Sequence, residues 1–202
     1  MKHSNSEEIA LNHFRQHGGL LRTKQAITLG IHPRTLYKLR DSGKIVPIVR
    51  GYYRLADLPP LSDPDLVAVA SAVPRGVICL ISALAYHEIT TQIPHQVDLA
   101  IEQQAKRPAL EHPPVRVFWF SGTAFSEGVE THLIDEISVR IFNPAKTIAD
   151  CFKFRNKIGL DVAMEAMEMN LRKRLSTADE IMEFARICRV EKVMRPYLEA
   201  ML

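Results

Sequence analysis

The side chains best suited to bind a polyanion in this 202-residue chain lie in one short predicted helix that begins at Pro33. Arg34 and Lys38 are four residues apart and therefore share a side of that helix, and Thr35 lies beside them. An arginine donates two hydrogen bonds to guanine O6 and N7, whereas lysine and hydroxyl groups often bind phosphate oxygens. We expect Arg34, Thr35 and Lys38 to contact base edges of double-stranded DNA. Tyr37 has two interpretations, a phosphate contact or a ring that covers the core.

Three predicted helices position this polar face. Apolar spacing and glycines place them at about residues 6–17, 23–29 and 33–42. Thr23 is the expected N-cap of the second helix, which Gly30 ends, and Pro33 suits the first position of the third. Leu36 and Leu39 are expected to face the core. Two short helices around a glycine turn predict a helix-turn-helix.

A β-hairpin is predicted directly after the third helix. Two β-rich runs, residues 45–49 and 52–55, flank a turn at Arg50 and Gly51, and such a hairpin would be the wing of a winged helix-turn-helix. Polar and basic side chains on the wing and at the start of the second helix are expected to bind the DNA backbone. The expected backbone contacts are Thr23, Lys24, Gln25, Tyr37, Lys44, Arg50 and Arg54.

Charge is divided unevenly along the chain, and this division predicts two domains. Residues 1–58 contain ten Lys or Arg and four Asp or Glu, a formal charge of +6, whereas residues 59–202 carry −3. A basic head on a slightly acidic body is expected if only the head meets a polyanion. The prolines that follow predict a break. We therefore predict a DNA-binding domain at 1–57, a linker at 58–64 and a second domain at 65–202.

The second domain is predicted to mix helices and strands, so the fold class of the whole chain is α+β. Asn143 and Thr177 are expected to cap helices, and Phe118, Trp119 and Phe120 are expected to lie in the core under helices. The expected helices lie near residues 63–73, 80–89, 144–155, 158–171, 177–188 and 191–201, and the expected strands near 96–101, 114–120 and 129–142, the last with a turn around 135–136.

Several short segments, in order, resemble a known family. In the head they are GGLLRT (18–23), GIHPRTLYKL (30–39), SGKI (42–45) and RGYYRL (50–55), and in the body they are ISALAYH (81–87) and NPAKTIAD (143–150). These segments resemble AbiEi-type antitoxins, the regulator half of type IV toxin-antitoxin pairs. The head carries the resemblance strongly and the body more loosely.

The resemblance implies a function that charge and periodicity do not. Proteins of this family repress their own operon by binding repeated promoter sites. Their second domain counters a nucleotidyltransferase-like toxin encoded alongside, without a stable complex between the two proteins. The expected partners are therefore promoter DNA and such a toxin, with no membrane partner.

Other chemistry finds little support among the remaining residues. Asp98 could be the first acid of a restriction-type nuclease, but the strand after it lacks an Asp/Glu-x-Lys set. The histidines are widely spaced, with no HxH or HExxH motif, and no P-loop, GxGxxG or GxSxG motif occurs. Gly-Ser, which a nucleotidyltransferase toxin would contain, does not occur either. We therefore expect no catalytic residue, no metal site and no cofactor.

The first residues lack an apolar secretory signal, so we expect a cytoplasmic protein. Cys79, Cys151 and Cys188 are far apart and are expected to be buried thiols. The basic cluster at 172–174 is interpreted as a helix end, with added DNA contact as the second interpretation. Two other functions stay open: a ligand-responsive winged-helix regulator without a toxin, which needs a polar-rimmed pocket in the body, and a DNA-targeted nuclease or modifying enzyme.

Overall fold

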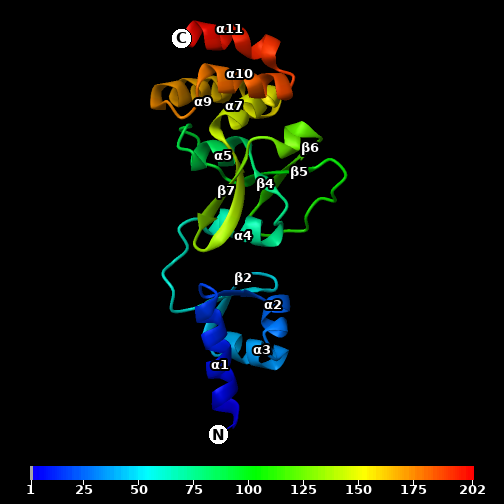
Figure 1. Cartoon of the computed structure of the whole chain (residues 1–202), viewed down its shortest axis with the longest axis vertical. Coiled ribbons are helices and arrows are strands. Elements are labelled where there is room, and N and C mark those ends of the chain that lie inside the picture. Colours follow the sequence, from blue (N-terminus) through cyan, green and yellow to red (C-terminus); the bar gives the residue numbers. More distant parts are fainter. Residues whose placement is uncertain (1) are drawn as a thin grey trace. The chain divides into compact units, whose positions relative to one another are not determined.

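The computed structural model describes residues 2–202, and contacts between Cα atoms divide the chain into two units. The first unit extends to Ala72 and includes residues 134–137; the second contains residues 73–133 and 138–202. Figure 1 shows the elements of both units coloured along the chain. Helices and strands alternate in each, which confirms the α+β class. The predicted domain limits, 1–57, 58–64 and 65–202, stay a prediction.

The first unit is a winged helix-turn-helix followed by one more helix. Its three strands form an antiparallel sheet in the order β1-β3-β2, in which β2 and β3 are the wing. The predicted three helices and hairpin are therefore confirmed. The elements are α1 (Lys2–Gln16), β1 (Leu20–Arg22), α2 (Thr23–Thr28), α3 (Pro33–Asp41), β2 (Ile45–Val49), β3 (Tyr52–Leu55) and α4 (Pro64–Ala72).

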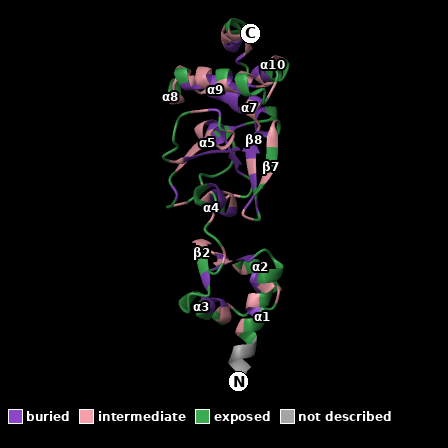
Figure 2. Cartoon of the chain, turned by 90° about the vertical axis from the view of Figure 1, so that its left-hand side faces the viewer, coloured by how far each residue is buried: buried purple, intermediate pink, exposed green. Residues whose placement is uncertain are grey.

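A small core joins the helices and the wing of this unit. Phe14 of α1, Leu36 and Leu39 of α3, and Ile45 of β2 all belong to one cluster of buried side chains. The purple segments of the lower part of Figure 2 are these inward faces, whereas the outer faces of the same helices are green. Burial of a leucine or phenylalanine contributes about 1.5–3 kcal/mol relative to exposure. The core therefore fixes which side of α3 faces solvent.

The start of α2 differs from the prediction. Thr23 is the first helical residue rather than the N-cap, which is Arg22 and makes no side-chain capping bond. The Thr23 N–H and hydroxyl both donate to the carbonyl oxygen of Gly51, at 2.9 and 3.2 Å. A partner 28 residues away takes the hydroxyl that a local cap would use. The three-residue strand β1 before it was not predicted, because so short a run has no detectable period.

The second unit is a five-stranded mixed sheet with helices. The strand order is β6-β5-β4-β8-β7, with β5 parallel to β6 and antiparallel to β4. The turn predicted around 135–136 is confirmed between β7 and β8, with both residues at positive φ, although the division by contacts counts residues 134–137 with the first unit. The elements are β4 (Val77–Ile78), α5 (Leu80–Tyr86), β5 (Val97–Glu102), β6 (Val115–Phe120), α6 (Thr123–Ser126), β7 (Val129–Ile134), β8 (Ile137–Phe142), α7 (Pro144–Lys153), α8 (Arg155–Ile158), α9 (Leu160–Lys173), α10 (Ala178–Ile187) and α11 (Glu191–Met201).

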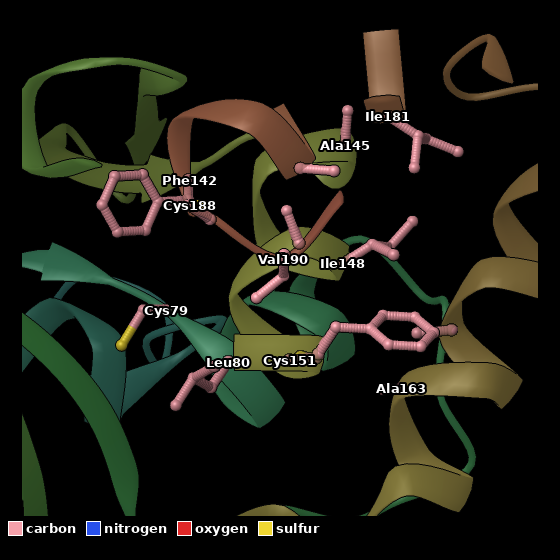
Figure 3. Close-up of a cluster of buried hydrophobic side chains, with 14 of the residues drawn as sticks. Cys79, Leu80, Phe142, Ala145, Ile148, Cys151, Ala163, Ile181, Cys188 and Val190 are labelled. Carbon is pink, nitrogen blue, oxygen red and sulfur yellow. The ribbon is translucent and has the colours of Figure 1, made fainter. Parts of the chain in front are cut away.

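The core of this unit forms around α7. The predicted caps are confirmed at two helices: the side chain of Asn143 accepts from the N–H of Lys146, and Thr177 forms a capping box with Glu180 at the start of α10. Figure 3 shows side chains of α7 packed with those of α9, α10 and β8. All three cysteines are buried and unpaired in this core, as predicted.

Trp119 is not in the core, contrary to the prediction. Phe118 and Phe120 are 3% and 2% exposed, but Trp119 between them is 45% exposed. Successive residues of a strand point to opposite faces, so three adjacent aromatic rings cannot share one core. The Trp119 indole donates to the carbonyl oxygen of Ala105 at 3.2 Å.

One fully buried ion pair lies inside this apolar core. The Lys146 ammonium donates to Asp150 one helical turn later, and both side chains are 0% exposed. The ammonium also lies 4.0 Å from the centre of the Phe142 ring, and the Cys188 thiol donates to the other Asp150 oxygen at 3.2 Å. Burial raises the pKa of Asp150, and Lys146 opposes that rise. The ionised form of Asp150 therefore depends on its pairing with Lys146.

This dependence predicts a non-additive pair of substitutions. Asp150→Ala should lower the free energy of unfolding by about 3–5 kcal/mol, because it leaves a buried ammonium without a carboxylate. The double variant Lys146→Met/Asp150→Leu should be much closer to the wild type, because apolar residues of similar volume replace the whole pair. Urea titrations followed by fluorescence of Trp119, the only tryptophan, report on this unit. Equal destabilisation of both variants would show that the ion pair is not the cause.

Candidate nucleic-acid interface

One face of α3 is polar and open to solvent. The helix begins at Pro33, and the ring nitrogen of His32 accepts from the N–H of Arg34 at 3.1 Å. Arg34 and Lys38 are exposed and Thr35 is half-buried. These three side chains, which the sequence predicts to contact bases, therefore occupy the side of α3 opposite its buried leucines.

The wing is tied to the start of α2. Gly51 at the wing turn has φ +77°, a conformation that disfavours other residues, and its carbonyl receives the two hydrogen bonds from Thr23. Arg50 at the turn is exposed, as are Lys24 and Gln25 in the first turn of α2. The predicted backbone contacts on α2 and on the wing turn therefore belong to two segments that hydrogen bonds join.

A recognition helix after a short glycine turn, followed by a two-stranded wing, is the arrangement found in winged DNA-binding domains. Residues 8–56 match the family model of AbiEi antitoxin transcriptional regulators. The resemblance predicted for the head is confirmed over this stretch. The match suggests a DNA-binding regulator, and it includes every side chain named above. It comes from a family of regulators rather than of enzymes.

The fold also matches a solved structure. The chain is similar to the crystal structure of the RV2827C protein from Mycobacterium tuberculosis, with a TM-score of 0.62 and 12% sequence identity. The match covers 89% of this chain and 71% of that one, and therefore extends over both units. At such low identity it establishes the fold alone. A comparison with curated proteins finds no match.

An acidic residue of α1 binds two of the lysines in the AbiEi-matching segment. The Glu7 carboxylate lies 2.6 Å from the Lys38 ammonium and 2.9 Å from that of Lys44. Its side chain is only 14% exposed, whereas the lysines are 60% and 48% exposed. Hydrogen bonds from Lys38 and Lys44 lower the pKa of Glu7 to about 2. In the absence of DNA, Lys38 and Lys44, both predicted to contact DNA, are therefore paired with the Glu7 carboxylate.

Two further predicted contacts have partners within the chain. Arg54 is half-buried, and its guanidinium donates to the carbonyl oxygen of Pro59. Tyr37 is 50% exposed, with the guanidinium of Arg40 5.1 Å from its ring centre. The Tyr37 ring therefore does not cover the core, which removes that interpretation. Its role as a phosphate contact stays a prediction.

The acid considered for nuclease chemistry is a buried side chain that pairs with a half-buried arginine. Asp98 on β5 is 1% exposed, and its two oxygens accept from Arg116 on β6 at 2.7 and 2.8 Å. Burial raises the pKa of Asp98, and the guanidinium of Arg116 opposes that rise. The carboxylate also accepts from the N–H of Ile81 at 3.1 Å. Through these hydrogen bonds, Asp98 links β5 to β6 and to α5.

No group of three or more His, Cys, Asp or Glu in residues 2–202 is arranged to bind a metal ion. Within the same range, no helix has the length and apolarity needed to cross a membrane.

Sequence reasoning missed Glu7 and Arg40. Glu7 is 31 residues from Lys38 and 37 from Lys44, so local sequence spacing does not predict these ion pairs. Arg40 contributes to the charge of the head, and helical spacing predicts no role for it. Its guanidinium lies over the Tyr37 ring and donates to Asp41 at 2.7 and 2.9 Å. A charged residue on the inner side of α1 was the only available signal for Glu7.

Removing the Glu7 charge should release both lysines. We expect Glu7→Gln to bind duplex DNA of unrelated sequence more tightly, with a plot of log K against log[salt] steeper by about 1–2, because two more phosphates are neutralised. Fluorescence anisotropy at several salt concentrations measures this slope.

Glu8→Gln is the matched control, because Glu8 is the exposed neighbour on α1 and its replacement changes the net charge equally. Identical slopes for the two variants would show that Glu7 does not restrain Lys38 and Lys44.

Proposed function

We propose that this protein is a sequence-specific transcriptional repressor that autoregulates its operon and acts as a type IV antitoxin against a nucleotidyltransferase-type toxin. The match of residues 8–56 to AbiEi antitoxin regulators carries this proposal. The exposed basic face of α3 and the +6 charge of residues 1–58 support its DNA-binding part. Both features are what binding to a phosphate backbone requires.

Base readout falls mainly to Arg34 in this proposal. It is in the first turn of α3, where recognition helices reach base edges, and no salt bridge involving it occurs among the described residues. Lys38 must exchange its bond with Glu7 for one with DNA. Thr35, half-buried beside Arg34, adds a hydroxyl that can accept or donate.

Backbone contacts divide between α2 and the wing. Lys24 and Gln25 bind the phosphates that the start of α2 crosses, and Arg50 binds those beside the wing turn. The bonds from Thr23 to Gly51 set the spacing between these two groups. Backbone contacts of this kind set register and orientation on the duplex, while base contacts select the sequence.

The antitoxin part of the proposal concerns the second unit. The description of the family that residues 8–56 match supports it. Segments 81–87 and 143–150, which resemble the same family in sequence and overlap α5 and α7, add to that support. Those two helices pack on each other in the core of this unit. The proposed toxin is a nucleotidyltransferase, opposed without a stable complex.

Base and phosphate contacts should respond differently to alanine. Arg34→Ala should weaken binding to the cognate operator by about 1–3 kcal/mol and binding to random duplex far less. Lys24→Ala should weaken both alike and reduce the salt slope by about 1. Parallel titrations of operator and random duplex measure this. Equal losses of Arg34→Ala on both duplexes would contradict the assignment.

Antitoxin activity should be separable from repression. The test expresses the product of the neighbouring gene, the proposed toxin, together with either the wild-type protein or the Arg34→Ala variant. We expect Arg34→Ala to restore growth as the wild type does while a promoter reporter is derepressed, because the variant alters the DNA-binding face alone. Failure of the wild-type protein to restore growth would contradict the antitoxin proposal and leave the DNA-binding proposal standing.

A further inference from the structure

The edge of the second unit's sheet where β5 and β6 end carries a group of polar and basic side chains that the proposed function does not use. The two strands are parallel and in register, with Glu102 opposite Phe120, so the chain leaves both at the same edge (Figure 1). Gln103 follows β5 and Ser121 follows β6. Open α/β sheets bind ligands beyond the carboxyl ends of their parallel strands.

Two open clefts lie at this edge and share Ser121 and Gly122. One has a volume of about 740 Å³ and is lined by Glu102, Gln103, Gln104 and Phe125 besides the shared residues. The other has a volume of about 510 Å³ and is lined by Thr123, Lys153, Cys188 and Arg189 besides them. Small-molecule sites occupy about 300–1,000 Å³. Together the clefts are large enough for an extended ligand with two chemically different ends.

The smaller cleft has the chemistry of a phosphate site. Lys153 and Arg189 are both exposed, and no Asp or Glu lines the cleft with them. Within the described chain, neither cation has a carboxylate at salt-bridge distance. Ser121 and Thr123 add hydroxyl donors to the same lining. Two cations and two hydroxyls without a competing acid favour a multiply charged anion.

The base of this cleft is electrically balanced. The Cys188 thiol donates to Asp150, whose other oxygen pairs with Lys146. Burial raises the pKa of Cys188 to about 12, so the thiol stays neutral and carries no charge into the cleft. The Lys153 ammonium lies 5.5 Å from the centre of the ring of Phe120, and Phe120 lines the larger cleft. The unpaired charge at this place is therefore positive.

The larger cleft has the chemistry of a nucleoside site. Gln103 and Gln104 are exposed carboxamides, which can donate to and accept from the edge of a base. Glu102, at the last position of β5, is exposed and can accept from ribose hydroxyls, the role of the acidic residue in dinucleotide sites. Phe125 supplies an apolar surface.

We propose that these clefts form one binding site for a nucleoside triphosphate, with the phosphates beside Lys153 and Arg189 and the nucleoside beside Gln103 and Gln104. Gly122 lines both clefts and has φ +53°, and no atom beyond its two chain neighbours lies within 4 Å of where its Cβ would be. The chain therefore leaves open space at the junction. The site is formed by the second unit alone and does not depend on the DNA-binding proposal.

Isothermal titration calorimetry of the full chain with ATP, GTP, CTP and UTP in magnesium-free buffer tests this site. At least one of the four should bind with a stoichiometry of one. Lys153→Met should weaken that binding by at least about tenfold, because it removes a charge-assisted hydrogen bond to a phosphate oxygen. Lys157→Met is the matched control, because Lys157 is also exposed and lies over the Phe154 ring as Lys153 does, but it lines neither cleft.

Three outcomes would overturn the proposal. They are no binding of any of the four nucleotides at millimolar concentration, equal weakening by Lys153→Met and Lys157→Met, and tighter binding of a 5′-phosphorylated single-stranded oligonucleotide than of every nucleotide where Lys153→Met weakens the oligonucleotide binding. Inorganic triphosphate separates the two parts of the site. Its binding should be weaker than that of the nucleotide, and Gln103→Leu/Gln104→Leu should weaken the nucleotide alone; equal affinities would overturn the nucleoside part.

Operator binding by Lys153→Met should equal that of the wild type, because Lys153 belongs to the second unit. Operator binding therefore distinguishes failure of the nucleotide site from failure of the repressor proposal. Because the first unit binds the operator, a urea titration followed by the fluorescence of Trp119 shows whether the second unit of the variant is folded.

Discussion

The burial of Leu36 and Leu39 is the constraint on which the DNA-binding surface depends. Both side chains are at most 1% exposed, so α3 can pack on the rest of its unit in one rotation only. A helix advances by about 100° per residue, and these two positions therefore determine where Arg34 and Lys38 point. Ile45 of the wing enters the same cluster. One small core thus positions both the recognition helix and the wing, which explains why so short a unit can present a defined surface.

Local signals made most of the fold predictable. Pro33 and Gly43 mark the ends of α3, and Asn143 and Thr177 begin α7 and α10, because caps and turns act within four residues of the chain. Apart from Trp119, where alternation along one strand decides the outcome, the errors concern contacts between distant segments. Thr23 is a residue type that often caps helices, but its hydroxyl donates to Gly51 of the wing turn. Strands β1 and β4 have only three and two residues, so pairing with neighbouring strands, and not their own sequence pattern, makes them strands.

The same limit applies to charges in the candidate sites. The exposed positions of Arg34 and Lys38 followed from helical periodicity, whereas the pairing of Lys38 with Glu7 required the fold to bring α1 against α3. Lys146 and Asp150 stand at the spacing of an ordinary surface pair on a helix, and only the surrounding helices and strands make them fully buried. Periodicity predicts which residues share a face, but not what covers that face.

Net charge is a guide to polyanions and a poor guide to small anions. Ionic screening confines exposed charges to about 8–10 Å, so a long phosphate backbone responds to the charge of a whole face, while a triphosphate responds to the few groups that line its cleft. Residues 59–202 carry −3 overall, which disfavours DNA. Lys153 and Arg189 nevertheless line one cleft that no acid lines, and Asp150, which accepts from the Cys188 thiol of that cleft, is paired with Lys146. A body with a slightly acidic surface can therefore avoid DNA and still bind a phosphorylated small molecule.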